Sequence, residues 1–333
     1  MKAVVLSKTG GVDVLKVSDV EMPEIGPHDC LVRIKYAGVN YADILSRQGL
    51  YNWQGKRPYI LGLESSGVVD QIGNKVTKFK IGDRVVIGSK SGNYAEYIAK
   101  HEDDIFSAPD FLSFEELACL CGNWAPAWAA LFEMARVRPG ETALIHAGAG
   151  GVGTAAIQLA TEHGMKVYAT ASSEKHQYVH QLGATPLKYG DFEKKLEAEN
   201  PNFILESVGG KIHAQSLKIL APLGHMVSLG ATGIKVNKLN LLSWYKAWRD
   251  YPQVSRSDLD NLTYSSLHVG FLLEDYRETI LPVWNRMIAF MEEKNLKPVL
   301  QKDCVYPMSK ASDAHALIDS RQNIGKLLLD PTR

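Results

Sequence analysis

The glycine-rich stretch HAGAGGVG, residues 146–153, constrains the fold more than any other part of the chain. It stands between a run of buried-strand character and a run of helical character, and it fits the GxGxxG pattern at Gly148, Gly150 and Gly153. In this pattern Gly148 permits a tight turn, Gly150 lets the backbone approach a pyrophosphate, and Gly153 lets the helix pack closely on the strand. Because the helix N-terminus offers unpaired N–H groups, the stretch predicts a dinucleotide site. The alternative is a glycine-rich loop that serves packing alone.

The residues around this turn alternate between strand and helix patterns. Apolar runs such as TALIHA, KVYATA and NFILESV alternate with amphipathic runs, two of which end at Gly164 and Gly183. This order predicts an α/β fold with a Rossmann-type, doubly wound parallel sheet and right-handed crossovers. Up to about Ile105 the chain shows only short strand patterns separated by Gly, Pro, Asn and Asp. The tail from about Pro298 is too small to fold alone, so we expect it to rejoin this N-terminal β region.

The composition is that of an ordinary globular protein, and 333 residues suit two domains. Lys plus Arg and Asp plus Glu each number 37, so no net field favours nucleic acid or an anionic membrane. The four cysteines form no CxxC pair, which predicts buried free thiols in a reducing cytosol. No signal-peptide pattern begins the chain. The longest apolar run, residues 117–132, contains Gly122, Asn123 and Pro126 and predicts a buried helix rather than a membrane span. The expected location is the cytoplasm.

The type of dinucleotide depends on the residues that follow the strand KVYATA. Sites for NAD usually carry an acid there, which binds the ribose 2′-hydroxyl. Here Ser172 and Ser173 come first, and Lys175 follows within the next turn, with no acid before Glu174. Small hydroxyls and a lysine suit a doubly charged 2′-phosphate, so the sequence favours NADPH. The alternative is that Lys175 is a solvated helix residue.

Six segments extend these signals over nearly the whole chain. They are GVNYADILSRQGLY (38–51), LGLESSGVV (61–69), IGDRVV (81–86), HAGAGGVG (146–153), ESVGG (206–210) and NIGKLLL (323–329). In this order and spacing they resemble the medium-chain dehydrogenase/reductase superfamily. The similarity is to its zinc-independent quinone oxidoreductase branch, which includes enoyl reductases, and there to the vesicle-amine-transport-type group. The resemblance implies a GroES-like β-barrel catalytic domain over residues 1–122, completed by 270–333, a Rossmann domain that binds NADPH over 123–269, and a homodimer.

The chain departs from the zinc alcohol dehydrogenases of this superfamily at the metal ligands. Asn40 stands where their catalytic site begins with Cys, and Leu63 replaces the His of their Gly-His-Glu motif. Leucine cannot bind a metal and asparagine is a poor zinc ligand, so no metal site is expected. Without a Lewis acid the substrate must already be electron-poor. A quinone fits, and so does a carbonyl conjugated with C=C, whose β carbon accepts hydride while charge moves to the oxygen.

The segment NYAD holds the candidate catalytic residues. Tyr41 has a phenol that can donate a proton, and the resemblance to enoyl reductases implicates this position in protonation of the α carbon. Asn40 offers an amide donor at the position where a zinc ligand is absent. Tyr51 is a candidate for the substrate pocket. Asp43 is a second pocket candidate, although capping of the helix that follows Asn40 is the simpler role. For each residue the alternative is a packing or turn function.

The remaining cofactor contacts are implied by the resemblance. With the glycine turn and the residues after the next strand, they form one predicted set: Gly148, Gly150, Gly151, Val152, Gly153, Ser172, Ser173, Lys175, Tyr189, Leu229, Gly230, Ala231, Gly270, Phe271, Asn323 and Lys326.

Two other groups of residues have simpler interpretations than ligand binding. His146, at the end of a strand, is expected to be a hydrogen-bonded core residue. The aromatic cluster from Trp244 to Tyr251 is expected to line a cleft or a dimer contact rather than a membrane surface.

The expected function is an NADPH-dependent, zinc-free oxidoreductase that reduces quinones or the C=C bond of α,β-unsaturated carbonyls by hydride transfer. Its expected partners are a small-molecule substrate and a second copy of the chain, with no nucleic acid and no membrane span. Two alternatives stay open. One is a zinc-type alcohol dehydrogenase. The other is a protein that binds NADPH in a non-enzymatic role, because a fold does not fix a function.

Overall fold

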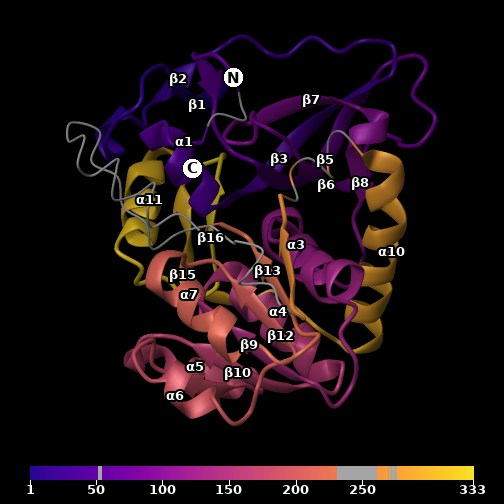
Figure 1. Ribbon diagram of the computed structural model, residues 1–333. Coiled ribbons are helices and arrows are strands. Elements are labelled where there is room, and N and C mark those ends of the chain that lie inside the picture. The colour runs from indigo at the N-terminus through magenta and orange to yellow at the C-terminus, as the bar shows by residue number, and fades with distance from the viewer. Residues whose placement is uncertain (52–54, 231–260, 269, 271–272, 274–275) are drawn as a thin grey trace. The chain divides into compact units, whose positions relative to one another are not determined.

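The computed structural model describes residues 1–51, 55–230, 261–268, 270, 273 and 276–333. It divides into two compact units. The first contains Met1–Ala125 and Val269–Arg333, and the second contains Pro126–His268 (Figure 1).

The first unit is built around a seven-stranded sheet with the order β15-β16-β3-β5-β6-β8, in which β7 also pairs with β3. The strands are β3 (Asp29–Val39), β5 (Glu64–Ile72), β6 (Arg84–Gly88), β7 (Tyr97–His101), β8 (Ile105–Ser107), β15 (Leu300–Pro307) and β16 (Lys326–Asp330). A small second sheet has the order β2-β1-β4, with β1 (Lys2–Leu6), β2 (Val17–Asp19) and β4 (Tyr59–Ile60). Helices α1 (Tyr41–Gln48), α2 (Phe114–Leu117), α10 (Arg277–Glu293) and α11 (Ala311–Asp319) complete the unit.

Strand β3 holds this sheet together because it changes partner along its length. It pairs with β7 from Asp29 to Arg33 and with β16 from Ala37 to Val39, while β5 runs beside most of it. Two register shifts between β3 and β5 let the strand bend between these partners. The C-terminal strand β16 therefore lies against the N-terminal β3, as Figure 1 shows by their yellow and indigo colours. The expectation that the tail rejoins the N-terminal β region is confirmed.

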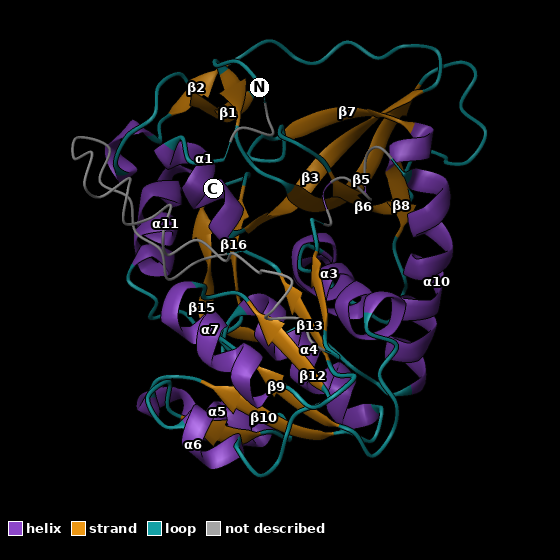
Figure 2. Ribbon diagram, in the orientation of Figure 1, coloured by secondary structure: helices purple, strands orange, loops and turns teal. Residues whose placement is uncertain are grey.

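The second unit has a six-stranded sheet with the order β11-β10-β9-β12-β13-β14, and every pairing in it is parallel. Its strands are β9 (Thr142–Ile145), β10 (Lys166–Thr170), β11 (Thr185–Leu187), β12 (Phe203–Glu206), β13 (His225–Ser228) and β14 (Thr263–Ser266). Helices α4 (Gly151–Glu162), α5 (His176–Gln181), α6 (Phe192–Leu196) and α7 (Gly210–Ile219) alternate with the strands (Figure 2). The predicted Rossmann-type α/β architecture is confirmed. Strand β14 and helix α10 are elements that the sequence patterns did not indicate.

The apolar run at 117–132 is buried as predicted, but it is not one regular helix. After α2, which begins with a capping box between Ser113 and Glu116, the chain forms a π-helical segment at Leu120–Trp124. Helix α3 (Ala125–Trp128) and a second π-helical segment at Ala129–Met134 follow. The predicted continuous helix is therefore wrong in its hydrogen bonding. Pro126 has no N–H to donate, and π segments commonly absorb such irregularities. Within the described ranges, no helix is long and apolar enough to cross a membrane.

Candidate functional site

The glycine turn lies between β9 and α4 and is shaped by close packing. A Cβ at Gly148 would lie 2.7 Å from the Cβ of Ala169 in β10, and a Cβ at Gly153 would collide with the carbonyl oxygen of Ala147. The close packing predicted for Gly153 is consistent with this geometry. The left-handed residue of the turn is Ala147, with φ 52°, and Gly148 allows close contact with β10.

Replacing Ala147 by glycine is expected to stabilise the second unit by about 1 kcal/mol, because an L-residue pays a steric cost in the left-handed region and glycine does not. The free energy of unfolding, measured in urea, should rise in Ala147→Gly. Ala143→Gly, in the buried strand β9, is the matched control and should lose stability. An unchanged or lower stability of Ala147→Gly would contradict the strain at this position.

The start of α4 is open to an anion. Its N-cap residue, Gly150, has no side chain that could cap the helix, and Gly151, Val152 and Gly153 form the first turn. The N–H groups of a first turn have no carbonyl partner one turn earlier in the helix. A phosphate group therefore fits this end of α4, where the helix dipole also favours negative charge.

The residues predicted to choose between NADPH and NADH lie within one turn after β10. Ser172 precedes a short 3₁₀ helix at Ser173–Lys175. Partial burial lowers the pKa of Lys175, against the opposing effect of the Glu174 carboxylate. A hydrogen bond from the Ser172 side chain lowers the pKa of Glu174. The predicted serines and lysine thus lie in one short turn, and the carboxylate of Glu174 interacts with both Ser172 and Lys175.

The other predicted cofactor residues are scattered over both units. In the second unit, the ring of Tyr189 stacks on His146 with 6.3 Å between centroids, and Leu229 and Gly230 directly follow β13. In the first unit, the Asn323 side chain donates to the carbonyl oxygen of Gly325 at 3.1 Å, and Gly270 is buried. Two predicted residues, Ala231 and Phe271, lie outside the described residues, as does the aromatic cluster 244–251.

His146 is a hydrogen-bonded core residue, as predicted. Its ring nitrogens lie 2.9 Å from the hydroxyl of Thr170 and 2.8 Å from that of Ser216. Burial lowers its pKa to about 4, with a smaller opposing effect from Glu206. The imidazole is therefore neutral near pH 7.

The first unit contains a partly buried polar cluster around Asn40, which the sequence analysis did not assemble. The Lys326 ammonium donates to Oδ1 of Asn40 at 2.6 Å and forms an ion pair with Glu64. The same Glu64 carboxylate accepts from Nδ2 of Asn40 at 2.9 Å and from the backbone N–H of Gly122 at 2.8 Å. A Cβ at Gly122 would lie 2.5 Å from Oδ1 of Asn40, so a larger residue there would displace this side chain. The cluster, defined as these four residues, joins the N-cap of α1, β5, β16 and the π-helical segment.

The sequence alone could have suggested that Glu64 and Lys326 are paired, because both charged residues stand in apolar segments. Glu64 lies in the apolar segment LGLESSGVV, and Lys326 directly precedes three leucines. Charged side chains are almost never fully buried unless they are paired. One acid and one base in strand-forming, apolar surroundings therefore suggest each other as partners.

Asp43 takes the capping role at the start of α1. Its carboxylate accepts the backbone N–H of Asn40 at 2.8 Å, and the side chain is fully buried. Burial raises its pKa to about 7, against the lowering effects of the Asn40 hydrogen bond and of Lys326. Full burial favours the capping role over a place in a substrate pocket.

The two predicted tyrosines are partly exposed in the first unit. Burial raises the pKa of Tyr41, while the guanidinium of Arg321 lowers it through charge and a hydrogen bond. Burial is also the main cause that raises the pKa of Tyr51, with a contribution from Asp43. Both phenols are protonated near pH 7 and so can donate a hydrogen bond.

The donor set around Asn40 does not suit a metal ion. The amide oxygen of Asn40 already accepts from the Lys326 ammonium, and its N–H donates to the Glu64 carboxylate. Within the part of the chain that the structure describes, no group of three or more His, Cys, Asp or Glu side chains could hold a metal.

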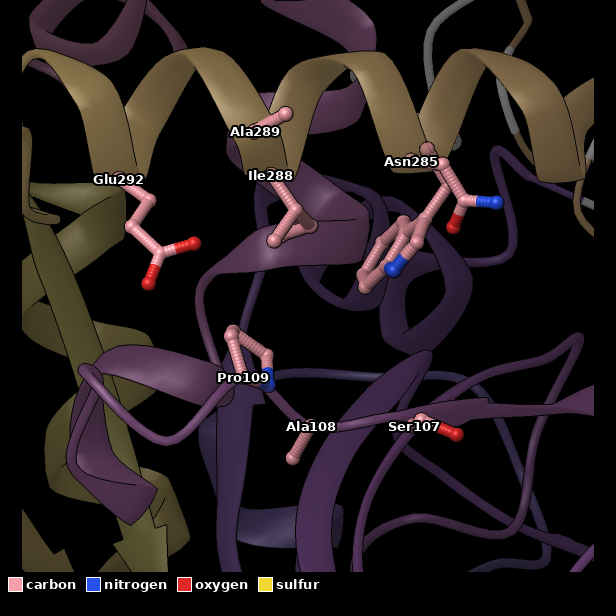
Figure 3. A pocket seen from close by; sticks show the side chains of 8 residues that line it. Ser107, Ala108, Pro109, Asn285, Ile288, Ala289 and Glu292 are labelled. Carbon is pink, nitrogen blue, oxygen red and sulfur yellow. The ribbon is translucent and has the colours of Figure 1, made fainter.

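A separate groove of about 270 Å³ lies on the first unit beside α10 (Figure 3). It is lined by Trp284, Ile288 and Ala289 of α10 and by Ala108 and Pro109. In Figure 3 the Ile288 side chain points toward Pro109. None of the predicted catalytic or cofactor residues lines this groove. The candidate site is therefore assigned to the glycine turn and the Asn40 cluster, each within its own unit.

Comparisons with known proteins show which family the chain resembles. Residues 26–113 match the family model described as alcohol dehydrogenase GroES-like domain, and residues 151–264 match that described as zinc-binding dehydrogenase. The synaptic vesicle membrane protein VAT-1 homolog of Mus musculus is 32% identical over 343 residues, which cover 99% of this chain and 84% of that protein. The quinone oxidoreductase of Mus musculus is 30% identical over 348 residues, which cover 99% of this chain and 97% of that protein.

Among solved structures, the Escherichia coli quinone oxidoreductase complexed with NADPH is similar with a TM-score of 0.84 and 27% identity, over 99% of this chain and 100% of that one. The GroES-like match also confirms the fold class that was predicted for the first unit.

Proposed function

Because the chain belongs to the medium-chain dehydrogenase/reductase superfamily, in the group of quinone oxidoreductases and VAT-1 proteins, we propose that it is an NADPH-dependent, zinc-free oxidoreductase. Its proposed substrates are quinones or the C=C bond of α,β-unsaturated carbonyl compounds. The family supports an oxidoreductase that uses a nicotinamide cofactor. The choice of NADPH, the absence of zinc and the substrate class are our proposal.

The observation that carries the proposal is the open N-terminus of α4 behind the glycine turn. Gly148 and Gly153 permit the turn to pack closely against β10 and Ala147. The N–H groups in the first turn of α4 have no side-chain cap and suit a pyrophosphate. Ser172, Ser173 and Lys175 follow the neighbouring strand β10 and would bind the 2′-phosphate. When bound, the dihydronicotinamide supplies hydride.

In the first unit the chain's own residues would act on the carbonyl oxygen and on the proton. Asn40 is partly exposed and carries an amide N–H that can stabilise negative charge as it develops on oxygen. Tyr41 keeps its proton near pH 7, because burial raises its pKa, and could deliver that proton after hydride transfer. The assignment of Tyr51 to the pocket, the homodimer and the cytoplasmic location stay predictions.

The zinc-free part of the proposal is supported by the chemistry of the cluster. A Lys326 ammonium that forms an ion pair with Glu64 and a hydrogen bond with Asn40 already places a positive charge among these side chains. A second cation at the same atoms would be repelled. Metal analysis of the purified protein tests this part: one zinc per chain would restore the alcohol dehydrogenase alternative.

The proposed function is tested by initial rates with a panel of quinones and enones, each assayed with NADPH and with NADH. We expect turnover with NADPH and a clear preference for it over NADH. No turnover above background with any acceptor, despite bound NADPH, would favour the non-enzymatic alternative.

Substitution of Lys175 tests the cofactor assignment. Lys175→Ala is expected to weaken NADPH binding about 10- to 100-fold, because it removes a charge-assisted hydrogen bond, and to leave NADH binding unchanged. Fluorescence titration of both cofactors measures the effect. Lys194→Ala, on the exposed face of α6, is the control and should change neither affinity. Equal losses for NADPH and NADH would refute recognition of the 2′-phosphate by Lys175.

A further inference from the structure

We propose that Lys326 and Glu64 are positioning residues that hold the Asn40 carboxamide in one orientation, with one N–H left to bind the carbonyl oxygen of the acceptor. The inference rests on the proposed reductase function and assigns Lys326 a role other than direct contact with the cofactor.

One partner of the Asn40 amide is a hydrogen-bond donor and the other is an acceptor. Lys326 can only donate, and its ammonium lies 2.6 Å from Oδ1. The Glu64 carboxylate only accepts, and its Oε1 lies 2.9 Å from Nδ2. A rotated amide would face the ammonium with its NH₂ group and the carboxylate with its oxygen. Both contacts would then be repulsive, so the pair permits a single orientation.

One N–H of this amide remains weakly bound. Nδ2 carries two hydrogens, and the first is used by Glu64. The second reaches only the carbonyl oxygen of Gly38, at 3.4 Å, beyond the ordinary range for an N–H···O bond. That N–H can therefore be exchanged for a ligand oxygen at little cost. As hydride adds to an enone or quinone, charge grows on the carbonyl oxygen, and a fixed donor stabilises it without reorganisation.

Exposure separates the residue that meets the ligand from those that support it. Lys326 is 2% exposed and Glu64 1% exposed, whereas Asn40 is partly exposed. The backbone of Asn40 is fixed as well, because its N–H donates to Asp43 and Gly122 approaches its side chain closely. Of these three residues only Asn40 is in part open to solvent, and the ion pair is enclosed.

Steady-state kinetics can distinguish two roles for Lys326, positioning of the Asn40 amide and direct contact with the cofactor. Lys326→Met should lower kcat about 10- to 100-fold and leave the KM for NADPH within about twofold, because it releases the amide but removes no cofactor contact. Lys326→Gln, which keeps a donor, should recover part of the loss. The control is Lys297→Met, which removes an exposed ammonium that lies 3.8 Å from the Glu116 carboxylate, and it should keep wild-type rates. A raised KM for NADPH with kcat intact would overturn the inference in favour of a cofactor contact.

A paired substitution separates positioning from stability. Glu64→Met with Lys326→Met removes both charges, so the double variant should be more stable than Lys326→Met alone. Because neither methionine orients an amide, kcat should stay low. Recovery of both stability and kcat would overturn the inference, since a merely structural pair would behave in that way.

A readout without turnover keeps the inference distinct from the proposed function. In ¹⁵N-labelled protein, the two side-chain amide protons of Asn40, assigned with Asn40→Asp, should give separate, slowly exchanging signals in the wild type. In Lys326→Met these signals should broaden or exchange quickly with solvent. Unchanged signals would overturn the inference. Absence of turnover in the wild type, with the amide still ordered, would refute the proposed reductase instead.

Discussion

Lys326→Met is expected to lower the free energy of unfolding of the first unit by about 3–5 kcal/mol, because it leaves the buried Glu64 carboxylate without its cation. Glu64 is 1% exposed, so water cannot replace the lost ammonium without opening the sheet. The remaining donors to Glu64, from Asn40 and Gly122, are neutral. A loss of this size is a large part of the stability of a typical domain.

Urea unfolding of the full chain measures this loss, and hydrogen exchange at the amides of β3 and β16 assigns it to the first unit. The matched comparison is Lys166→Met, which removes one partner of an exposed ion pair with Glu199 at 2.7 Å. That variant should lose at most about 1 kcal/mol. If the two variants lost the same small amount, the Lys326–Glu64 pair would not be buried in solution.

The second unit is expected to lose about 3 kcal/mol of stability between pH 6.5 and pH 4. The folded state holds the pKa of His146 at about 4, through burial, whereas the unfolded chain binds a proton near the ordinary value of 6.5. The second unit therefore has its full stability, as far as His146 is concerned, above pH 6.5. Its stability falls below that pH, because the unfolded state gains a proton at His146 that the folded state does not. Each pH unit in this interval costs about 1.4 kcal/mol, until the folded state is protonated as well.

The first unit contains two buried groups whose effects oppose each other over the same interval. Burial lowers the pKa of His315 to about 3, which destabilises the folded state as pH falls below 6.5. Burial raises the pKa of Asp43 to about 7, so the folded state takes a proton before the unfolded chain does. Acidification from pH 7 toward pH 4 therefore stabilises the fold through Asp43. The two units should respond differently to mild acid, with the second unit unfolding first.

Hydrogen exchange at pH 7 and pH 5 measures the stability of each unit in the same sample. His146→Gln, which cannot gain a proton, should remove most of the acid sensitivity of the second unit and cost some stability at every pH. Glu102, in the first unit, does not affect the comparison between pH 7 and pH 5. Hydrogen bonds from the backbone of Thr77 and Lys78 lower its pKa to about 2, so the stability that it contributes is lost only below about pH 4.5. A second unit equally stable at pH 7 and pH 5 would contradict the assignment to His146.

The Rossmann-type unit could be predicted from the sequence because its signals are local. The turn at Gly148–Gly153 and each strand or helix pattern span a few neighbouring residues, and the parallel order follows from their alternation. The Asn40 cluster has no such local pattern. Asn40 bonds to Glu64 across 24 positions and to Lys326 across 286, and only the folded β3 and β16 bring them together.

The π-helical segment at Leu120–Trp124 escaped prediction for a related reason. An apolar run with a serine cap predicts an ordinary helix, whereas the N–H of Gly122 donates to Glu64, 58 positions earlier in the chain, a contact that no local pattern indicates. In the same way, the left-handed residue at Ala147 could not be distinguished from the neighbouring glycines by residue type, since glycine favours that region.

The pairing of β16 with β3 sets an order of events during synthesis. Ribosomes deliver the second unit in one continuous stretch, whereas the first unit lacks its strand β16, and with it Lys326, until residues 326–330 emerge. The nascent N-terminal segment therefore carries Glu64 without its cation and the Ala37–Val39 edge of β3 without its partner while the rest is made. Emergence of residues 326–330, rather than translation of residues 1–125, is the moment at which the first unit can close.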